Sequence, residues 1–318
     1  MDRWVRSLRG PRSDRSVSSQ PRVLHESERL PGGGVISAAT VFLTGKECPF
    51  SCVYCDLWQQ TMTGPTPRGS LPEQLKSALS DISQRSLIKL YNASNFFDPS
   101  AVPPDDDNTL LGLLLDFERV TVECHPRFIG RRCFDFADRL DGTLEVAIGL
   151  ETAHPVALSR LNKQMTLSDF DAAAAELAQR RIGLRVFLLL GCPFIPKEDQ
   201  LEWTFRSVEH AVRQGASVIS IIPVRGGNGA LEALVARNEW ASPPIELIEA
   251  AAERVVKLKL DTAVVQIDAW DLKQHIGCHV CGQARVQRLQ EMNRAGAWYP
   301  SIQCTVCGLE EQGAGTGA

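Results

Sequence analysis

Short apolar segments alternate with stretches of helical periodicity over most of this 318-residue chain, and this alternation restricts the possible folds more than any other feature. Strands are predicted at Ala39–Thr44, Leu87–Asn92, Arg119–Glu123, Leu144–Leu150, Leu184–Leu190 and Ser217–Pro223. Helices are predicted at Leu71–Gln84, Thr109–Glu118, Arg127–Leu140, Ser168–Arg181, Lys197–Gln214 and Pro244–Leu258. Because the strands are apolar throughout, they favour a parallel sheet that is covered by helices.

Six strand–helix units with right-handed crossovers form either an open doubly wound sheet or a (β/α) barrel. A closed barrel of the TIM type needs eight units, so we expect an α/β fold with a partial (β/α)6 TIM-like barrel at residues 35–268. A short strand at Ala263–Ile267 ends this core. Residues 269–318 show little periodicity and contain two CxxC pairs, which predicts a small C-terminal metal module with four cysteines.

The first 34 residues contain seven arginines, six serines and few apolar side chains, and they end in Gly32-Gly33-Gly34. We interpret residues 1–34 as a basic, mobile arm. This segment lacks the apolar core of a secretory signal, and the chain has no run of 18 apolar residues that could span a membrane. Together with ten unevenly spaced cysteines, these features predict a cytoplasmic protein in a reducing compartment.

Three of the cysteines, Cys48, Cys52 and Cys55, crowd into a loop that follows the first predicted strand of the barrel. The carboxyl ends of barrel strands carry the loops that form active sites. A closed zinc site normally has four ligands, and the sequence offers no fourth one nearby. A [4Fe–4S] cluster held by three cysteines leaves one iron open to a substrate or cofactor, whereas a loop of thiols around some other metal is the alternative.

The spacing CxxxCxxC, with Tyr54 as the aromatic residue before the last cysteine, resembles the signature of the radical S-adenosylmethionine (SAM) superfamily. The resemblance implies that the open iron binds the amino and carboxylate groups of SAM and that Tyr54 packs near the adenine. It also implies a one-electron reductant of the ferredoxin or flavodoxin type. One electron would then cleave SAM and release a 5′-deoxyadenosyl radical, which abstracts hydrogen from the substrate.

Further segments between residues 39 and 235 resemble the elongator and methylthiotransferase-like branch of this superfamily. The segment Leu90–Pro99 resembles the motif after the second strand, which implies that Ser94 and Asn95 contact the methionine end of SAM. The Gly-Gly-Glu stretch of many members is absent there. A turn held by Asn and Ser side chains is the alternative.

The segment Glu145–Lys163 resembles a motif shared by elongator-type subunits and by the archaeosine-forming radical SAM lyases. This resemblance implies that Glu151 hydrogen-bonds the ribose or amino group of SAM. Glu123, which ends the third strand, and Arg185, which opens the fifth, are assigned to the same cofactor site. Alternatively, either glutamate only pairs with Arg185. The loop Arg225–Gly229 is interpreted either as a further approach to SAM or as a flexible turn.

The four C-terminal cysteines form the pairs Cys278/Cys281 and Cys304/Cys307, with 22 residues between the pairs. Four thiolates fit a structural zinc ion, but a second, auxiliary iron–sulfur cluster would use the same ligands, and unligated thiols are a third possibility. Basic and aromatic residues lie between the two pairs. They are interpreted either as an RNA-binding surface or as ordinary surface charge on a helix: Arg285, Arg288, Arg294, Trp298 and Tyr299.

These observations predict a radical SAM enzyme with a [4Fe–4S] cluster, SAM and zinc or a second cluster. The basic arm and the C-terminal module favour RNA, and tRNA in particular, as the substrate. A peptide or small-metabolite substrate is the alternative, and a non-catalytic iron–sulfur or zinc scaffold is a third hypothesis. The sequence assigns no catalytic residue of its own to the reaction.

Overall fold

A single curled sheet dominates the computed structural model, which describes residues 1–12, 20–84 and 86–307. The strand order is β1 to β8, with β1 antiparallel to β2 and every later pair parallel. The strands are β1 (Arg22–Arg29), β2 (Val35–Phe42), β3 (Leu87–Tyr91), β4 (Arg119–Glu123), β5 (Thr143–Glu151), β6 (Gly183–Leu190), β7 (Val218–Pro223) and β8 (Val264–Ile267).

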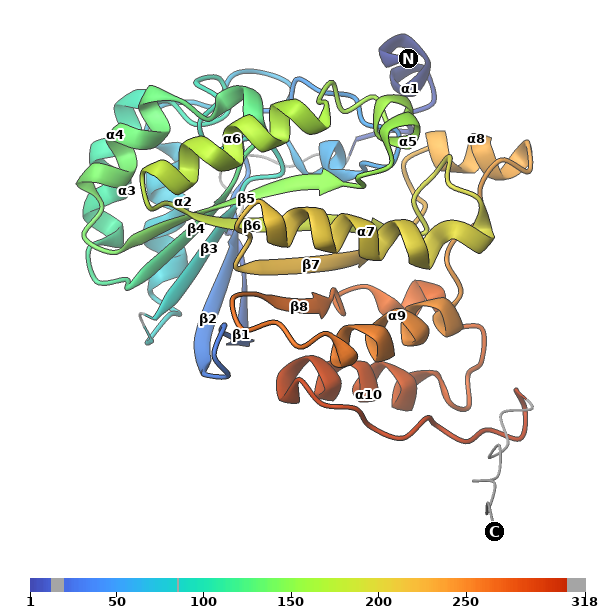
Figure 1. Ribbon diagram of the computed structural model, residues 1–318. Coiled ribbons are helices and arrows are strands. Elements are labelled where there is room, and N and C mark those ends of the chain that lie inside the picture. Colours follow the sequence, from blue (N-terminus) through green and yellow to red (C-terminus); the bar gives the residue numbers. More distant parts are fainter. Residues whose placement is uncertain (13–19, 85, 308–318) are drawn as a thin grey trace.

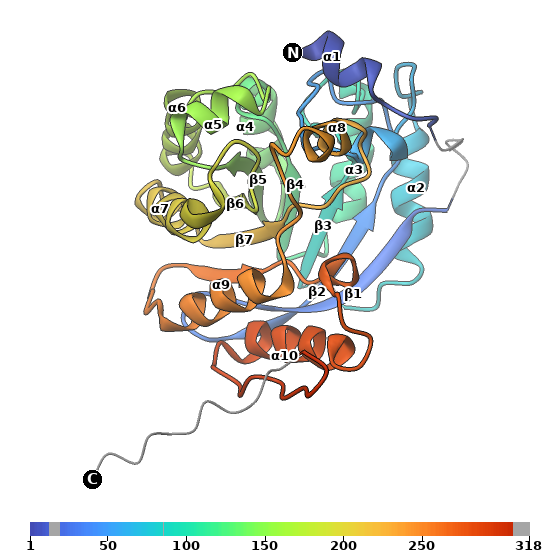
Figure 2. The same cartoon turned by 90° about the vertical axis from the view of Figure 1, so that its right-hand side faces the viewer.

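Most helices lie on the outer side of this sheet (Figures 1 and 2). They are α1 (Asp2–Ser7), α2 (Ser70–Leu79), α3 (Asp107–Leu114), α4 (Arg131–Arg139), α5 (Pro155–Arg160), α6 (Leu167–Gln179), α7 (Gln200–Arg213), α8 (Ala230–Ala236), α9 (Ile245–Lys257) and α10 (Gly282–Ala295). Short 3-10 turns occur at Leu57–Gln60, Pro104–Asp106, Pro126–Phe128, Lys197–Asp199 and Leu272–His275.

The half-barrel confirms the predicted α/β architecture. The six predicted strands correspond to β2–β7, and the short seventh prediction corresponds to β8. Helix α6 begins with a local hydrogen-bonding motif. The Thr166 hydroxyl accepts a hydrogen bond from Asp169 N at 3.2 Å, and the Asp169 carboxylate accepts one from Thr166 N at 2.8 Å, which completes a capping box for α6.

The first 34 residues differ from the prediction of a mobile arm. Their described part contains helix α1, whose Val5 is buried, and strand β1, which pairs along its whole length with β2. The sequence of β1 did not suggest a strand because two of its inward positions, Glu26 and Glu28, carry carboxylates instead of apolar side chains. These carboxylates are tolerated there because each one meets a cation or another polar side chain of another strand.

A layer of paired charges fills the interior of the half-barrel on the inner face of β1. Glu28 Oε2 lies 2.6 Å from Lys89 Nζ of β3, and Glu28 also bonds Arg185 of β6. Arg185 Nε donates to Glu145 Oε2 of β5 at 2.7 Å. Burial raises the pKa of Glu28, but the charges and hydrogen bonds of Arg185 and Lys89 outweigh it and lower this pKa to about 2.

The C-terminal region is more ordered than its weak periodicity suggests, because α10 lies between the two cysteine pairs and packs against α9, β1 and β8. Arg285 and Arg288 of this helix are buried. Arg285 Nη1 lies 2.7 Å from Glu246, and Arg288 Nη2 lies 2.8 Å from Glu253. The interpretation of these two arginines as surface charge or as an RNA-binding surface is therefore wrong, since their ion pairs connect α10 to α9.

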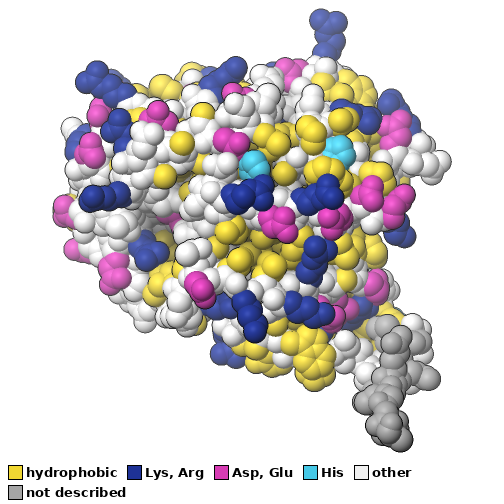
Figure 3. All heavy atoms as spheres, viewed as in Figure 1, with side chains coloured by type: hydrophobic (Ala, Val, Ile, Leu, Met, Phe, Trp, Pro, Cys, Tyr) yellow, Lys and Arg dark blue, Asp and Glu magenta, His cyan; other side chains and the backbone are white. Residues whose placement is uncertain are grey.

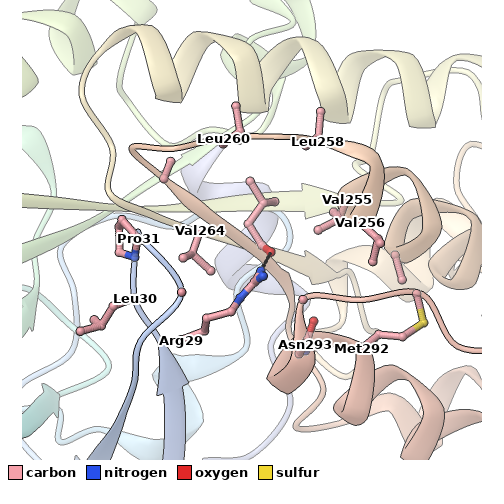
Figure 4. A pocket seen from close by; sticks show the side chains of 16 residues that line it. Arg29, Leu30, Pro31, Val255, Val256, Leu258, Leu260, Val264, Met292 and Asn293 are labelled. Carbon is pink, nitrogen blue, oxygen red and sulfur yellow. Dashed lines mark hydrogen bonds between the residues drawn. The ribbon is translucent and has the colours of Figure 1, made fainter.

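A cavity of about 100 Å³ lies at the seam between β1 and β8 (Figure 4). Its walls come from the β1–β2 turn, α9, β8 and α10, and most of the lining residues are apolar. Arg29 Nη2 donates to Val265 O at 3.4 Å across this seam. The cavity lies near the amino end of β2, at the opposite end of the sheet from the three-cysteine loop.

The outer surface carries charges of both signs. Figure 3 shows basic and acidic side chains interspersed over the face that carries α6, α7 and α9. None of the helices in the described part of the chain is both long enough and apolar enough to cross a bilayer.

Candidate cofactor site

The three-cysteine loop leaves β2 at the carboxyl end of the half-barrel. Leu43 N still donates to Tyr91 O of β3 at 2.8 Å, and the chain then turns at Gly45. A Cβ atom at Gly45 would stand 2.9 Å from Thr66 Oγ1 and 3.0 Å from Ala101 O. A larger residue would collide with these atoms, so glycine allows the loop to start close to the sheet.

The thiols of Cys48, Cys52 and Cys55 lie near one another, since the charge of Cys48 raises the pKa of Cys52 and the charges of both raise that of Cys55. Burial raises the pKa of all three, that of Cys52 to about 12. Lys163 opposes this effect at Cys48 and Cys52. Without a bound cation these groups stay protonated, whereas a coordinating metal removes the proton. The donor set therefore fits an iron–sulfur cluster.

Several elements that are distant in sequence hold the backbone of this loop. Arg6 Nε donates to Ser51 Oγ at 2.8 Å from the N-terminal segment. Asn162 Nδ2 donates to Ser51 O at 2.7 Å, and Asn228 Nδ2 donates to Val53 O at 2.5 Å. No role was predicted for Arg6 or Asn162, and the loop containing Asn228 was expected to approach SAM or to form a flexible turn, not to hold the cysteine loop.

Asn95 connects the cysteine loop to the next strand. Its Nδ2 donates to Cys48 Sγ at 3.3 Å, and its Oδ1 accepts from His125 N at 2.7 Å. The His125 ring packs against Phe50 of the cysteine loop, with ring centroids 4.1 Å apart. Asn95, which was expected to contact SAM, thus contacts the Cys48 thiol directly and uses both ends of its amide group.

Unpartnered polar atoms gather beside the cysteine loop, at the ends of β3 and β4. Both amide atoms of Asn92, Ser94 Oγ and Glu123 Oε1 are buried, and none has a hydrogen-bond partner among the described residues. Burial raises the pKa of Glu123 to about 7, although the backbone N–H groups of residues 92–94 lower it. Buried polar atoms are nearly always paired, so this group indicates a site for a polar ligand.

Glu151, Lys163 and Tyr54 form a second polar group at the same end of the sheet. Lys163 Nζ donates to Glu151 Oε1 at 2.7 Å and to Tyr54 Oη at 3.4 Å. Glu151 has a φ of 67°, a left-handed conformation that is uncommon outside glycine. A Cβ atom at Gly149 would stand 2.0 Å from Glu151 Oε1 and 2.8 Å from Lys163 Nζ, so glycine makes room for this ion pair.

The structure thus brings most of the predicted cofactor residues to one end of the sheet: Cys48, Cys52, Tyr54, Cys55, Ser94, Asn95, Glu123 and Glu151. Arg185 does not join them, because it lies near the amino end of β6 and bonds Glu28 and Glu145. The alternative interpretation paired Arg185 with Glu123 or Glu151. Arg185 does pair with glutamates, but these are Glu28 and Glu145. Lys163 was missed as a site residue, although it ends the segment that carries the family resemblance.

The four C-terminal cysteines form a separate compact group. The four sulfur atoms all lie within 4.8 Å of one another. Cys278 Sγ is 3.9 Å from Cys304 Sγ, and Cys281 Sγ is 3.6 Å from Cys307 Sγ. Backbone N–H groups of Cys281 and Val280 lower the pKa of Cys278 to about 6, which favours the thiolate that binds metals. This group could hold a metal ion.

Comparisons of the sequence with known proteins show distant relatives. No protein-family model matches it. An uncharacterised protein of Methanocaldococcus jannaschii is 25% identical over 215 residues, which are 65% of this chain and 58% of that protein. The archaeosine synthase subunit beta of Methanosarcina acetivorans is 23% identical over 243 residues, 72% of this chain and 69% of that protein. The chain thus spans little more than half of the first relative.

Solved structures share the fold at low sequence identity. Methylornithine synthase (PylB) superposes with a TM-score of 0.53 and 13% identity, covering 81% of this chain and 70% of that one. Elp3 of the archaeon Methanocaldococcus infernus gives a TM-score of 0.51 and 12% identity, covering 70% and 58%. The chain therefore shares its fold with these two proteins.

Proposed function

We propose that the protein is a radical SAM enzyme that binds a [4Fe–4S] cluster through Cys48, Cys52 and Cys55. One observation carries the proposal: the three thiols of the CxxxCxxC loop lie beside buried polar side chains that lack partners, at the carboxyl end of a half-barrel. A cluster ligated by three cysteines leaves one iron open. When bound, the cluster supplies the single electron that cleaves SAM into methionine and a 5′-deoxyadenosyl radical.

The chain's own residues would bind and orient SAM. Glu123, Asn92 Oδ1 and Ser94 Oγ can accept hydrogen bonds from an ammonium group. Lys163 is the cation that faces Cys52 and Glu151, and it can pair with a carboxylate. The Glu151–Lys163 pair is held over Gly149 and therefore has little freedom to move. These groups complement the two charged ends of an amino acid.

The test of this proposal is SAM cleavage by anaerobically purified protein that has been refilled with ferrous ion and sulfide. With a chemical reductant, we expect the wild-type protein to form 5′-deoxyadenosine from SAM. The triple variant Cys48→Ala/Cys52→Ala/Cys55→Ala should lose about four irons per chain and all 5′-deoxyadenosine formation. Cys133→Ala, which removes a buried cysteine of α4, is the matched control and should retain the iron.

Two results would contradict the proposal. The first is a wild-type protein that takes up no cluster. The second is a triple variant that keeps its iron and still forms 5′-deoxyadenosine.

For the C-terminal cysteines we propose a single zinc ion. Four sulfurs at about 2.3 Å from one zinc stand about 3.8 Å from each other in a tetrahedron. The two measured separations of 3.9 and 3.6 Å support this arrangement. Cysteines that ligate different irons of a cluster stand farther apart, because the cluster lies between them.

We further propose RNA, and tRNA in particular, as the substrate. The support is the similarity to archaeosine synthase subunit beta. Arg285 and Arg288 are buried and add nothing to this proposal. Filter binding of unfractionated tRNA should tighten as salt is lowered, since phosphate contacts release counterions. Undetectable binding at low salt would favour a peptide or metabolite substrate instead.

A further inference from the structure

Four aromatic side chains from distant parts of the chain meet inside the half-barrel, and we call them the aromatic floor: Phe42, Tyr91, Phe187 and Trp270. The ring centroids of Phe42 and Trp270 are 5.5 Å apart, and those of Tyr91 and Phe187 are 6.1 Å apart. Tyr91 also lies 6.4 Å from both Phe42 and Trp270. Such edge-to-face contacts fix the orientation of the rings.

The rings face the interior of the half-barrel. In a strand, residues two apart point to the same face. Phe42, Tyr91 and Phe187 each follow a polar residue of the inner charged layer by two positions: Thr40, Lys89 and Arg185. Tyr91 of β3 touches Phe187 of β6 although these strands are not neighbours, so the contact crosses the interior.

The aromatic floor keeps contact with solvent, whereas the layer below it does not. Thr40, Lys89 and Arg185 are at most 5% exposed. Phe42, Tyr91 and Phe187 are only half-buried, and Trp270 is 43% exposed. Because the charged layer closes the interior underneath, solvent reaches the rings from the carboxyl end, where the cysteine loop lies. Apolar surface left open beside a functional site indicates a place for a partner.

Carboxylates border the aromatic floor. Glu26 Oε1 accepts a hydrogen bond from Trp270 Nε1 at 2.7 Å, and Asp268 Oδ1 accepts one from Trp270 N at 2.9 Å. Glu123 points inward above the floor, since it follows the inward-facing Thr121 by two positions and its charge acts on Tyr91. The nearby Arg225 is already paired with Asp56 and Asp271.

One cation stands at the edge of the aromatic floor. The guanidinium of the exposed Arg22 lies 5.7 Å from the centre of the Phe42 ring. Flat rings, acceptor oxygens and a single cation complement the three parts of a nucleotide: the base, its N–H donors and its phosphate. A tyrosine or tryptophan side chain offers a ring and one donor but no anionic group, and a phenylalanine side chain offers only the ring.

We propose that the aromatic floor receives the base of an RNA nucleotide and so presents the substrate to the cofactor site. This inference rests on the proposed function, because it places a substrate beside bound SAM. Trp270 contributes most, since it is the most exposed ring and lies outside the strands. Trp270 is thus a substrate-binding residue.

The test uses 2-aminopurine riboside, a purine whose fluorescence falls when it stacks on an aromatic ring. The reconstituted wild-type protein should quench the probe saturably, and Trp270→Leu should weaken binding about 5- to 150-fold. Trp270→Phe keeps a ring and should recover most of the affinity. Trp298→Leu removes a Trp that is 54% exposed outside the aromatic floor, and it should bind the probe within about twofold of wild type.

Thermal unfolding of each variant confirms that it is folded. Equal binding by wild type and Trp270→Leu would overturn the proposal, as would a loss of binding in Trp298→Leu alone. Competition by phenylalanine amide as effective as that by guanosine would overturn the choice of a base. Formation of 5′-deoxyadenosine by the wild-type protein tests the proposed function separately, so the two proposals can fail independently.

Discussion

At the scale of single residues, the Glu151–Lys163 pair shows how a site can depend on a contact that spacing does not reveal. Glu151 is buried and Lys163 is largely so, with 12% of its side chain exposed. Their charged atoms lie 2.7 Å apart, and the pair needs a glycine at 149 and a left-handed backbone at 151. Natural chains keep such strain where the surrounding structure or the function requires it. This strain supports the proposal that the ion pair helps to orient SAM.

Replacing Lys163 by Met should weaken SAM binding about tenfold or more and lower the free energy of unfolding by about 3–5 kcal/mol. The reason is that Glu151 would remain buried without its cation. Equilibrium dialysis with SAM and denaturant unfolding measure the two effects.

The conservative variant Lys163→Arg should keep most of the affinity for SAM, because it retains the charge. Lys197→Met, at an exposed position before α7, should leave both quantities unchanged. A Lys163→Met protein that binds SAM like wild type would remove this lysine from the site.

At the scale of elements, β1 forms a strand whose inner face is held by charges. Glu28 of this strand connects β1 to β3 through Lys89 and to β6 through Arg185. Its pKa of about 2 lies below the usual value of 4.5. The charged form is therefore favoured in the folded protein, and the resulting stabilisation is complete above pH 4.5 and is lost as the pH falls towards 2.

Glu28→Gln should lower the free energy of unfolding by about 3 kcal/mol at pH 7. The difference from wild type should shrink as the pH falls below 4.5, because wild-type Glu28 then becomes protonated too. Urea unfolding at pH 7, 5 and 3.5 measures this trend. Ser27→Ala, on the exposed face of the same strand, is the control and should be neutral. A difference that is independent of pH would contradict the ionic role of Glu28.

At the scale of the whole molecule, α10 closes the seam between the two edge strands of the half-barrel. The four cysteines bracket this helix, so a metal ion bound to them would hold both of its ends. Trp270 lies between β8 and the first of these cysteines. Such an ion would thus support one wall of the interior in addition to the C-terminal segment itself.

The double variant Cys304→Ser/Cys307→Ser should lose one zinc per chain, keep the iron of the first site and unfold about 5 °C or more below wild type. Metal quantification and thermal unfolding measure these changes. Val306→Ser, an exposed position between the same two ligands, should change neither quantity. Loss of iron instead of zinc would assign a second cluster to the C-terminal cysteines.

The sequence alone determined the features that depend on short-range patterns. Strand and helix periodicity indicated β2–β8, because apolar runs reflect burial on both faces of a parallel sheet. The spacing of Cys48, Cys52 and Cys55 indicated three neighbouring thiols, since side chains that share a short loop must be close. The grouping of the four C-terminal cysteines was also predicted, because each CxxC pair brings two sulfurs together.

Only the tertiary structure decided which distant residues meet. The charges of β1 conceal a strand in the sequence and become acceptable once Lys89 and Arg185 face them. Arg285 and Arg288 look like surface charge until α9 supplies their partners. The aromatic floor combines rings from β2, β3, β6 and the segment after β8. Such contacts depend on how the sheet curls, and no local pattern in the chain encodes that curvature.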